Sequence, residues 1–130
     1  MICANPDKVV QRGARLIYCG GALAELYGAM GGAVIMAGKP HAPIYEASYA
    51  AAAALMDRPL DRRRVLAIGD GIATDLAGAA AQGLDALFIA GGIHGAETRR
   101  PDGRLDPAAA EVLLAAHGAR AAWLMDELDW

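Results

Sequence analysis

The chain has 130 residues, enough for one domain with a modest apolar core. Its formal net charge is −3, and its basic runs are confined to residues 62–64 and 99–100, which we expect to be solvated loop charges. A nucleic-acid partner is therefore not expected, because such proteins concentrate basic residues on one face. No apolar stretch reaches the ~18 residues of a membrane span and no signal peptide opens the chain, so we expect a cytoplasmic protein without a membrane partner.

The two cysteines, Cys3 and Cys19, form no CxxC pair and give no disulfide framework. Each lies in or beside an apolar segment, which favours buried free thiols in a reducing compartment.

The first half of the chain alternates strand and helix signals. Residues 15–19 (RLIYC) are a short β-prone run, and Leu23, Leu26, Tyr27 and Met30 then recur at helical spacing. Residues 33–37 (AVIMA) are a second strand, and a long Ala-rich helix is predicted over 43–56. Residues 2–4 resemble the end of a strand entering a turn, so we expect the chain to lack something upstream.

The second half continues the alternation. We predict strands at 65–68, 86–90 and 121–124, a helix over about 74–82, a loop over 94–106, and a last helix opened by Pro107 and closed by Gly118. Such a pattern is typical of right-handed βαβ units. The expected fold is α/β, with a Rossmann-like, mainly parallel sheet flanked by helices.

Two aspartates follow the strand predicted at 65–68. Asp70 lies at the strand end, where open α/β sheets bind their ligands, and Asp75 lies one helical turn further on. Asp70 stands where a dinucleotide's pyrophosphate would approach, so the segment is not a dinucleotide fingerprint, but a divalent cation could lie between it and a phosphate. Asp75 could orient the cation's waters or accept hydrogen bonds from the loop. The alternative is structural: Asp70 as a turn residue and Asp75 as a helix-start carboxylate.

Lys39 ends another predicted strand, fixed between Gly38 and Pro40. Its ammonium could neutralise a phosphate in the same crevice, although most loop lysines are simply solvated. His41 and His94 also follow strand ends and are candidate ligands or acids, with packing or surface roles as the commoner alternative. Asn5-Pro6-Asp7 is a turn by composition.

Four segments together resemble a known family: CANPD (3–7), GGALAELY (20–27), AGKPHAPIYE (37–46) and IGDGIATDLAGAAAQGLDALFIAGGIH (68–94). In this order they resemble the C-terminal half of a haloacid dehalogenase (HAD) superfamily phosphatase of subclass IIA, the nitrophenylphosphatase-like and ribonucleotide monophosphatase-like branch. The resemblance implies a truncated core that lacks the N-terminal core strands and most of the cap. Residues 1–37 would be the cap remnant and cap–core junction, and residues 38–130 the C-terminal half of the core.

The resemblance also implies roles for individual residues. Lys39 corresponds to the lysine that steadies the nucleophile and the transferred phosphoryl group, and Asp70 to an aspartate that binds Mg²⁺. Asp75 corresponds to the second acid of that motif, and Asn5 and Asp7 fall in the family's NPD turn. We therefore expect Lys39, Asp70 and Asp75 to be catalytic, and Asn5 and Lys39, with His41 from its place after a strand end, to bind substrate. The metal is assigned to Asp70 and Asp75, with Asp7, His41 and His94 as further candidates.

The chain departs from the family pattern at the nucleophile. Nothing in it resembles the DxDG motif that supplies the attacking aspartate, and the Ser/Thr of the second motif is missing too. Covalent catalysis through an aspartyl-phosphate is therefore closed to this chain alone.

Three hypotheses follow from that gap. The first is an inactive C-terminal piece of a HAD phosphatase. The second is an independent metal-dependent phosphoesterase that uses metal-activated water around Asp70 and Asp75. The third is an interaction module that has lost its catalytic activity. Oxygen ligands favour Mg²⁺ or Mn²⁺, whereas nearby histidines would permit Zn²⁺. We expect a phosphorylated small molecule as substrate, and a homodimer that covers the open sheet edge and uncovered helices.

Overall fold

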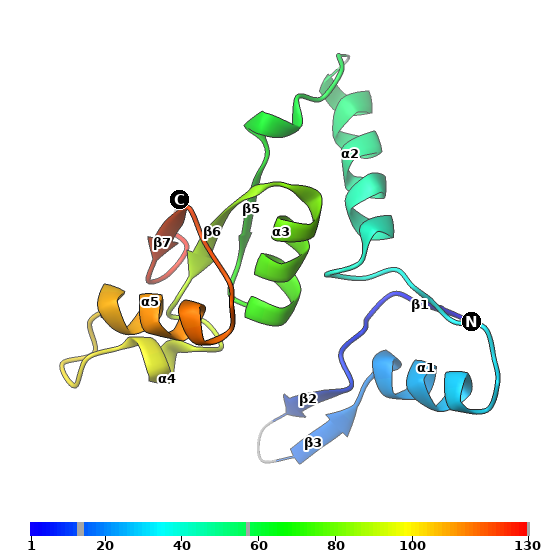
Figure 1. The fold of residues 1–130 in the computed structure, drawn as a ribbon, viewed down its shortest axis with the longest axis horizontal. Coiled ribbons are helices and arrows are strands. Elements are labelled where there is room, and N and C mark those ends of the chain that lie inside the picture. Colours follow the sequence, from blue (N-terminus) through cyan, green and yellow to red (C-terminus); the bar gives the residue numbers. More distant parts are fainter. Residues whose placement is uncertain (13–14, 57, 130) are drawn as a thin grey trace. The chain divides into compact units, whose positions relative to one another are not determined.

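The computed structural model describes residues 1–12, 15–56 and 58–129. The chain divides into two compact units, Met1–Arg58 and Pro59–Trp130, each with its own strands and helices (Figure 1). The two units are defined by how compactly each packs. Their boundary does not test the assignment of residues 1–37 to a cap and 38–130 to a core, which stays a prediction.

The first unit contains two small sheets and two helices. Its elements are β1 (Ile2–Cys3), β2 (Val9–Arg12), β3 (Arg15–Tyr18), α1 (Gly20–Ala29), β4 (Ile35–Met36) and α2 (Ala42–Met56). β1 pairs with β4 in parallel, and β2 pairs with β3 as an antiparallel hairpin (Figure 1). The strands predicted near 15–19 and 33–37 and the helix predicted over 43–56 are confirmed, with small differences at their ends.

The hairpin corrects one expectation. Residues 15–19 were expected to enter the parallel alternation, but β3 pairs antiparallel with β2, and β2 has no counterpart in the prediction. Only two residues separate these strands in the sequence. A parallel pair needs a crossover of about a dozen residues or more, so a connection this short permits only the antiparallel arrangement.

The second unit is built on one parallel sheet in the order β5-β6-β7. Its elements are η1 (Arg62–Arg64), β5 (Leu66–Gly69), η2 (Ile72–Leu76), α3 (Ala77–Gln82), β6 (Asp85–Ile89), α4 (Gly95–Thr98), α5 (Pro107–Ala116) and β7 (Trp123–Met125). The alternation of parallel strands with helices confirms the predicted α/β class.

Local chemistry explains where the helices of the second unit begin and end. The Asp106 carboxylate accepts hydrogen bonds from the backbone N–H groups of Ala108 and Ala109, which caps α5 one residue before Pro107. After α3 the chain turns through Gly83 at φ 66°, a conformation that favours glycine. These capping residues are visible in the sequence, so the prediction located both helices.

Two details differ from the prediction. The helix expected from residue 74 begins at Ile72 with the wider π-helical turn η2. The segment 94–106, expected to be a loop, contains the short helix α4 and an antiparallel bridge between Arg99 and Leu105. The buried Thr98 hydroxyl donates to Ala90 O, which ties α4 to the end of β6. Sequence periodicity does not reveal a contact of this kind.

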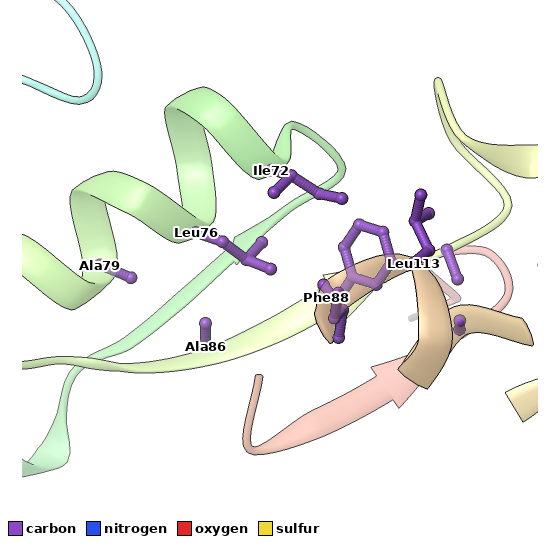
Figure 2. Packing of buried hydrophobic residues seen from close by; sticks show 9 residues of the cluster. Ile72, Leu76, Ala79, Ala86, Phe88 and Leu113 are labelled. Carbon is purple, nitrogen blue, oxygen red and sulfur yellow. The ribbon is translucent and has the colours of Figure 1, made fainter. Parts of the chain in front are cut away.

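The core of the second unit lies on one face of the sheet. On β6, Ala86 and Phe88 point to this face, and the Phe88 ring lies between the η2 side chains and Leu113 of α5 (Figure 2). The opposite face carries apolar side chains that remain substantially exposed, among them Leu66, Ile68 and Trp123. Across the described residues, no helix combines the length and apolarity needed to cross a membrane.

Candidate functional site

Asp70 lies where β5 ends, as the sequence predicted. Its half-buried carboxylate accepts a hydrogen bond through Oδ2 from the backbone N–H of Ile93, at 2.9 Å. Ile93 follows β6, so the ends of two neighbouring parallel strands meet at this carboxylate. The position matches the rule that open α/β sheets bind ligands at the carboxyl ends of their strands.

Gly92 closes around the same carboxylate. A Cβ atom built at Gly92 would overlap the Asp70 side chain, so this position is closed to any larger residue. The turn from Gly91 to Ile93 therefore contacts Asp70 at two points. The backbone of Gly92 packs against the Asp70 side chain, and the N–H of Ile93 donates to its carboxylate. Both contacts fix the carboxylate without using another side chain.

Asp75 is buried and serves the loop between β5 and η2. Its Oδ2 accepts a hydrogen bond from the backbone N–H of Gly71 at 3.0 Å, and a Cβ atom on Gly69 would overlap its carboxyl group. Of the two roles left open by the sequence, the structure shows hydrogen bonding to the loop. A role of Asp75 as a metal ligand remains a prediction.

The donor set at this edge can be compared with the needs of a cation. Within the described ranges, no group of three or more His, Cys, Asp or Glu residues is arranged to hold a metal ion. Mg²⁺ is commonly bound by one or two carboxylates, its remaining ligands being waters and substrate phosphates, whereas structural Zn²⁺ sites need four protein ligands and catalytic ones three. Asp70 with Asp75 nearby therefore fits Mg²⁺ or Mn²⁺ better than Zn²⁺.

Lys39 lies in the first unit, on a tightly packed turn. A Cβ atom on the buried Gly38 would overlap Ala4 O and approach Pro6, so the Gly38-Lys39-Pro40 turn packs directly on the segment that leads into Asn5-Pro6-Asp7. The Lys39–Pro40 peptide bond is cis. Two of the segments that resemble the family, the Gly38-Lys39-Pro40 turn and the segment around Asn5-Pro6-Asp7, thus lie side by side, and Lys39 is exposed.

The Asn5-Pro6-Asp7 segment is a turn, as its composition predicted. Asn5 Oδ1 accepts a hydrogen bond from the backbone N–H of Asp7 at 3.1 Å, and Asp7 O accepts one from Gly21 N–H at 3.0 Å. The Asn5 side chain is therefore used by the turn itself. Substrate binding by Asn5 and metal binding by Asp7 stay predictions.

The two candidate histidines have different surroundings. His41 is exposed, and its backbone N–H donates to Gly38 O at 2.9 Å. His94 is half-buried next to Ile93, with Nδ1 3.1 Å from Glu97 Oε1 and its ring 6.2 Å from that of Phe88. Neither contact tests a role in substrate or metal binding, so both assignments remain predictions.

Sequence reasoning missed the contacts that hold the Asp70 turn in place. Arg99 forms an ion pair with Asp126 at 2.8 Å where β7 ends, and Gly91 N–H donates to Asp126 O at 2.8 Å. The double glycine directly after a predicted strand was the available signal, because two adjacent glycines there indicate close backbone packing. The amide of Ile93 carries no signal of its own.

Comparison with known proteins defines the class. The sequence profile of the HAD-hydrolase-like family matches residues 36–119, and the chain therefore belongs to this family. It is similar to the crystal structure of a haloacid dehalogenase-like family hydrolase from Brucella suis 1330, with 46% identity, a TM-score of 0.69, and coverage of 98% of this chain and 44% of that one. Among curated proteins, none gives a significant match.

More distant structures share the fold. A possible sugar phosphatase of the HAD superfamily from Cytophaga hutchinsonii has 20% identity and a TM-score of 0.67, covering 99% of this chain and 42% of that one. The p-nitrophenyl phosphatase from Archaeoglobus fulgidus has 22% identity and a TM-score of 0.65, with 97% and 42% covered. The resemblance to the HAD superfamily is confirmed by the family profile and by the Brucella suis structure. The chain spans less than half the length of these three proteins.

Proposed function

We propose that the chain is a divalent-metal-dependent phosphoric ester hydrolase of the HAD family, with its site built on Asp70 and Asp75. The observation that carries the proposal is the Asp70 carboxylate, held by the Ile93 amide where two parallel strands end. The family profile spans this segment, which supports phosphate chemistry there. The substrate class is a phosphorylated small molecule, and the preferred cofactor is Mg²⁺.

Each candidate residue has a distinct task in this proposal. Asp70 holds the cation, Asp75 keeps the loop before η2 in shape, and Lys39 neutralises the phosphate, with Asn5 and His41 at the substrate. When bound, Mg²⁺ supplies charge neutralisation at the phosphate and activates a water molecule.

Water is the proposed nucleophile because this chain has no aspartate pair of the kind that attacks phosphate in the covalent route. In all 130 residues no two aspartates are separated by a single residue, so the DxD pattern of the covalent route is not available on this chain. The same observation supports a second candidate function. The chain would then be catalytically inactive alone, and would act as the C-terminal part of a phosphatase or as an interaction module derived from one.

Hydrolysis assays separate the two functions. Aryl phosphate monoester and diester turnover should be measured with Mg²⁺, Mn²⁺ or Zn²⁺, for the wild type and for Asp70→Asn. We expect Mg²⁺- or Mn²⁺-dependent turnover that falls at least about 100-fold in Asp70→Asn, since a metal ligand is lost. Turnover that survives in Asp70→Asn would exclude Asp70 as an essential ligand.

Two further outcomes are informative. Asp75→Asn keeps an oxygen that can accept the Gly71 N–H, so we expect it to lose less turnover than Asp70→Asn. If no metal supports turnover by the folded wild type, the independent phosphoesterase is ruled out and the second candidate function stands.

Self-association is a separate expectation of the same proposal. Exposed apolar side chains on the uncovered face of the β5-β6-β7 sheet, including Leu66, Ile68 and Trp123, favour a two-fold homodimer. Sedimentation at micromolar concentration should therefore give a dimer or a larger species. A well-folded monomer at that concentration would contradict the expectation.

A further inference from the structure

Thr98 is a completely buried hydroxyl residue that the proposed function does not use. Its Oγ1 donates to Ala90 O at 2.6 Å and lies 3.1 Å from His94 O. The bond to His94, four residues back, is the ordinary local bond of a threonine in a helix. The shorter bond reaches Ala90, eight residues back, and helix geometry alone does not account for it.

Ala90 and His94 are the two ends of the turn that holds Asp70. Between them, Gly92 closes against the Asp70 side chain and the Ile93 amide donates to its carboxylate. The start of the turn is also tied to the end of β7, because Ala90 N–H donates to Met125 O at 2.8 Å. The Thr98 hydroxyl lies at the base of the turn, within hydrogen-bond distance of the carbonyls at both ends.

We infer that Thr98 is a positioning residue: its hydroxyl fixes the turn 90–94 so that the Ile93 amide holds the Asp70 carboxylate in place. The inference rests on the proposed function in one respect, that the Asp70 carboxylate binds a cation. Without the hydroxyl, the buried Ala90 carbonyl loses a short hydrogen bond and the two ends of the turn are no longer joined. The Ile93 amide and the Asp70 carboxylate then lose their fixed separation.

Core packing by the Thr98 methyl group is the competing explanation, and substitutions can separate the two. Thr98→Val keeps the shape and removes the hydroxyl, whereas Thr98→Ser keeps the hydroxyl and removes the methyl group. Ser48→Ala is a matched control, because Ser48 Oγ also donates to a helix carbonyl, Ile44 O at 2.8 Å, on the exposed surface of α2.

Two measurements on the full chain test the inference. The first is NMR hydrogen exchange of the Ile93 amide, with the Ala122 amide, which donates to Ala86 O at 2.9 Å, as a reference in the same unit. The second is Mn²⁺ affinity by titration calorimetry. In Thr98→Val we expect Ile93 exchange to become about threefold faster or more while Ala122 is unchanged. Mn²⁺ affinity should fall about 10-fold, as is typical when support behind a metal ligand is lost.

The conservative variant decides the outcome. Thr98→Ser should stay within about twofold of the wild type in both measurements, and so should Ser48→Ala, because each keeps the Thr98-site hydroxyl. Equal losses in Thr98→Ser and Thr98→Val, or an unchanged Ile93 amide in folded Thr98→Val, would overturn the inference.

The inference can still be tested if Thr98→Val does not fold or if the wild type binds no Mn²⁺. If Thr98→Val does not fold, Thr98→Ser and Thr98→Cys provide a pair of similar size that differs mainly in donor strength, and only the cysteine variant should lose Ile93 protection. If the wild type binds no Mn²⁺, the proposed metal site fails. The Ile93 exchange rate then still shows whether Thr98 positions the turn.

Discussion

The two units of the chain hold their candidate site residues by different means. In the second unit, Asp70 follows β5 and Asp75 lies in η2, and the side chains of η2, α3, β6 and α5 share one continuous apolar cluster. In the described part of the first unit, the buried apolar residues are Cys3, Ala24 and Tyr49, which lie in three separate elements. Helix α1 and its C-cap residue Met30 expose an apolar stripe at helical spacing, made of Leu23, Leu26, Tyr27 and Met30.

The difference separates two kinds of support. The acids of the second unit are placed by strand ends that a core holds in position, whereas Lys39 is placed by two turns that pack on each other. We therefore expect the second unit to keep its structure by its own packing. The first unit exposes more large apolar side chains than the second, so it offers surface for association in addition to the β5-β6-β7 sheet face.

The largest effect that tests this comparison is expected at Phe88. Phe88→Ala removes a fully buried ring and should lower the free energy of unfolding of the second unit by about 3–5 kcal/mol. Leu55→Ala is the control, because Leu55 is 89% exposed and a surface substitution usually changes stability by less than about 0.5 kcal/mol. Urea unfolding followed through amide signals of both units gives the result. An equal loss in both units would show that they unfold together and would break the comparison.

A smaller effect is expected at the turn that holds Asp70. Gly92→Ala forces a Cβ atom into the Asp70 side chain and should destabilise the second unit by about 1–3 kcal/mol. Gly95→Ala is the matched control, since its Cβ atom would meet only Arg99 Nε, at 3.7 Å, an ordinary contact. The urea midpoint should fall for Gly92→Ala and stay or rise for Gly95→Ala. Similar midpoints for the two variants would mean that the turn moves aside freely.

The smallest effect is expected at the exposed start of the second unit. Arg63 pairs with Asp61 at 2.9 Å and lowers the pKa of that carboxyl below its ordinary value of 3.8. A carboxyl whose pKa is lowered on folding adds stability at pH values above its unfolded pKa, and this stability is lost as the pH falls through the folded pKa. The contribution is small because solvent screens an exposed pair.

Asp61→Asn tests this pair. Its unfolding free energy should lie slightly below that of the wild type at pH 7, and the two should converge as the pH falls below about 3.8, where the wild-type carboxyl also loses its charge. Urea unfolding of both proteins between pH 7 and pH 2 measures the difference. A difference that does not change with pH would contradict a contribution from the charge of Asp61.

The parts of the fold that could be predicted depend on local signals. The helix after Pro107, the end of α3 at Gly83, and the strands on either side of Asp70 follow from capping residues and apolar runs. The hairpin of β2 and β3 was missed because β2 carries no strong alternation of its own. Helix α4 was missed because it has only four residues, too few for a helical period to be recognised in the sequence.

The acidic residues of the candidate site could be predicted from the sequence, but the hydrogen-bond partners that hold them could not. The strand end pointed to Asp70, and the family resemblance linked it with Lys39. Asp75 accepts a hydrogen bond from the Gly71 amide, and Asp70 accepts one from the Ile93 amide. Both contacts depend on how the chain folds back on itself. Backbone amides are the same at every residue except proline, so no residue type announces such a partner.

The use of backbone amides has a consequence for how this site tolerates change over evolution. The Ile93 side chain is 71% exposed, yet the N–H of the same residue holds Asp70. Most replacements at position 93 would leave that donor intact, and the position would vary freely among homologues while remaining essential in its main chain. Proline alone removes the donor. A variable position that never accepts proline would be the imprint of this site in a family alignment.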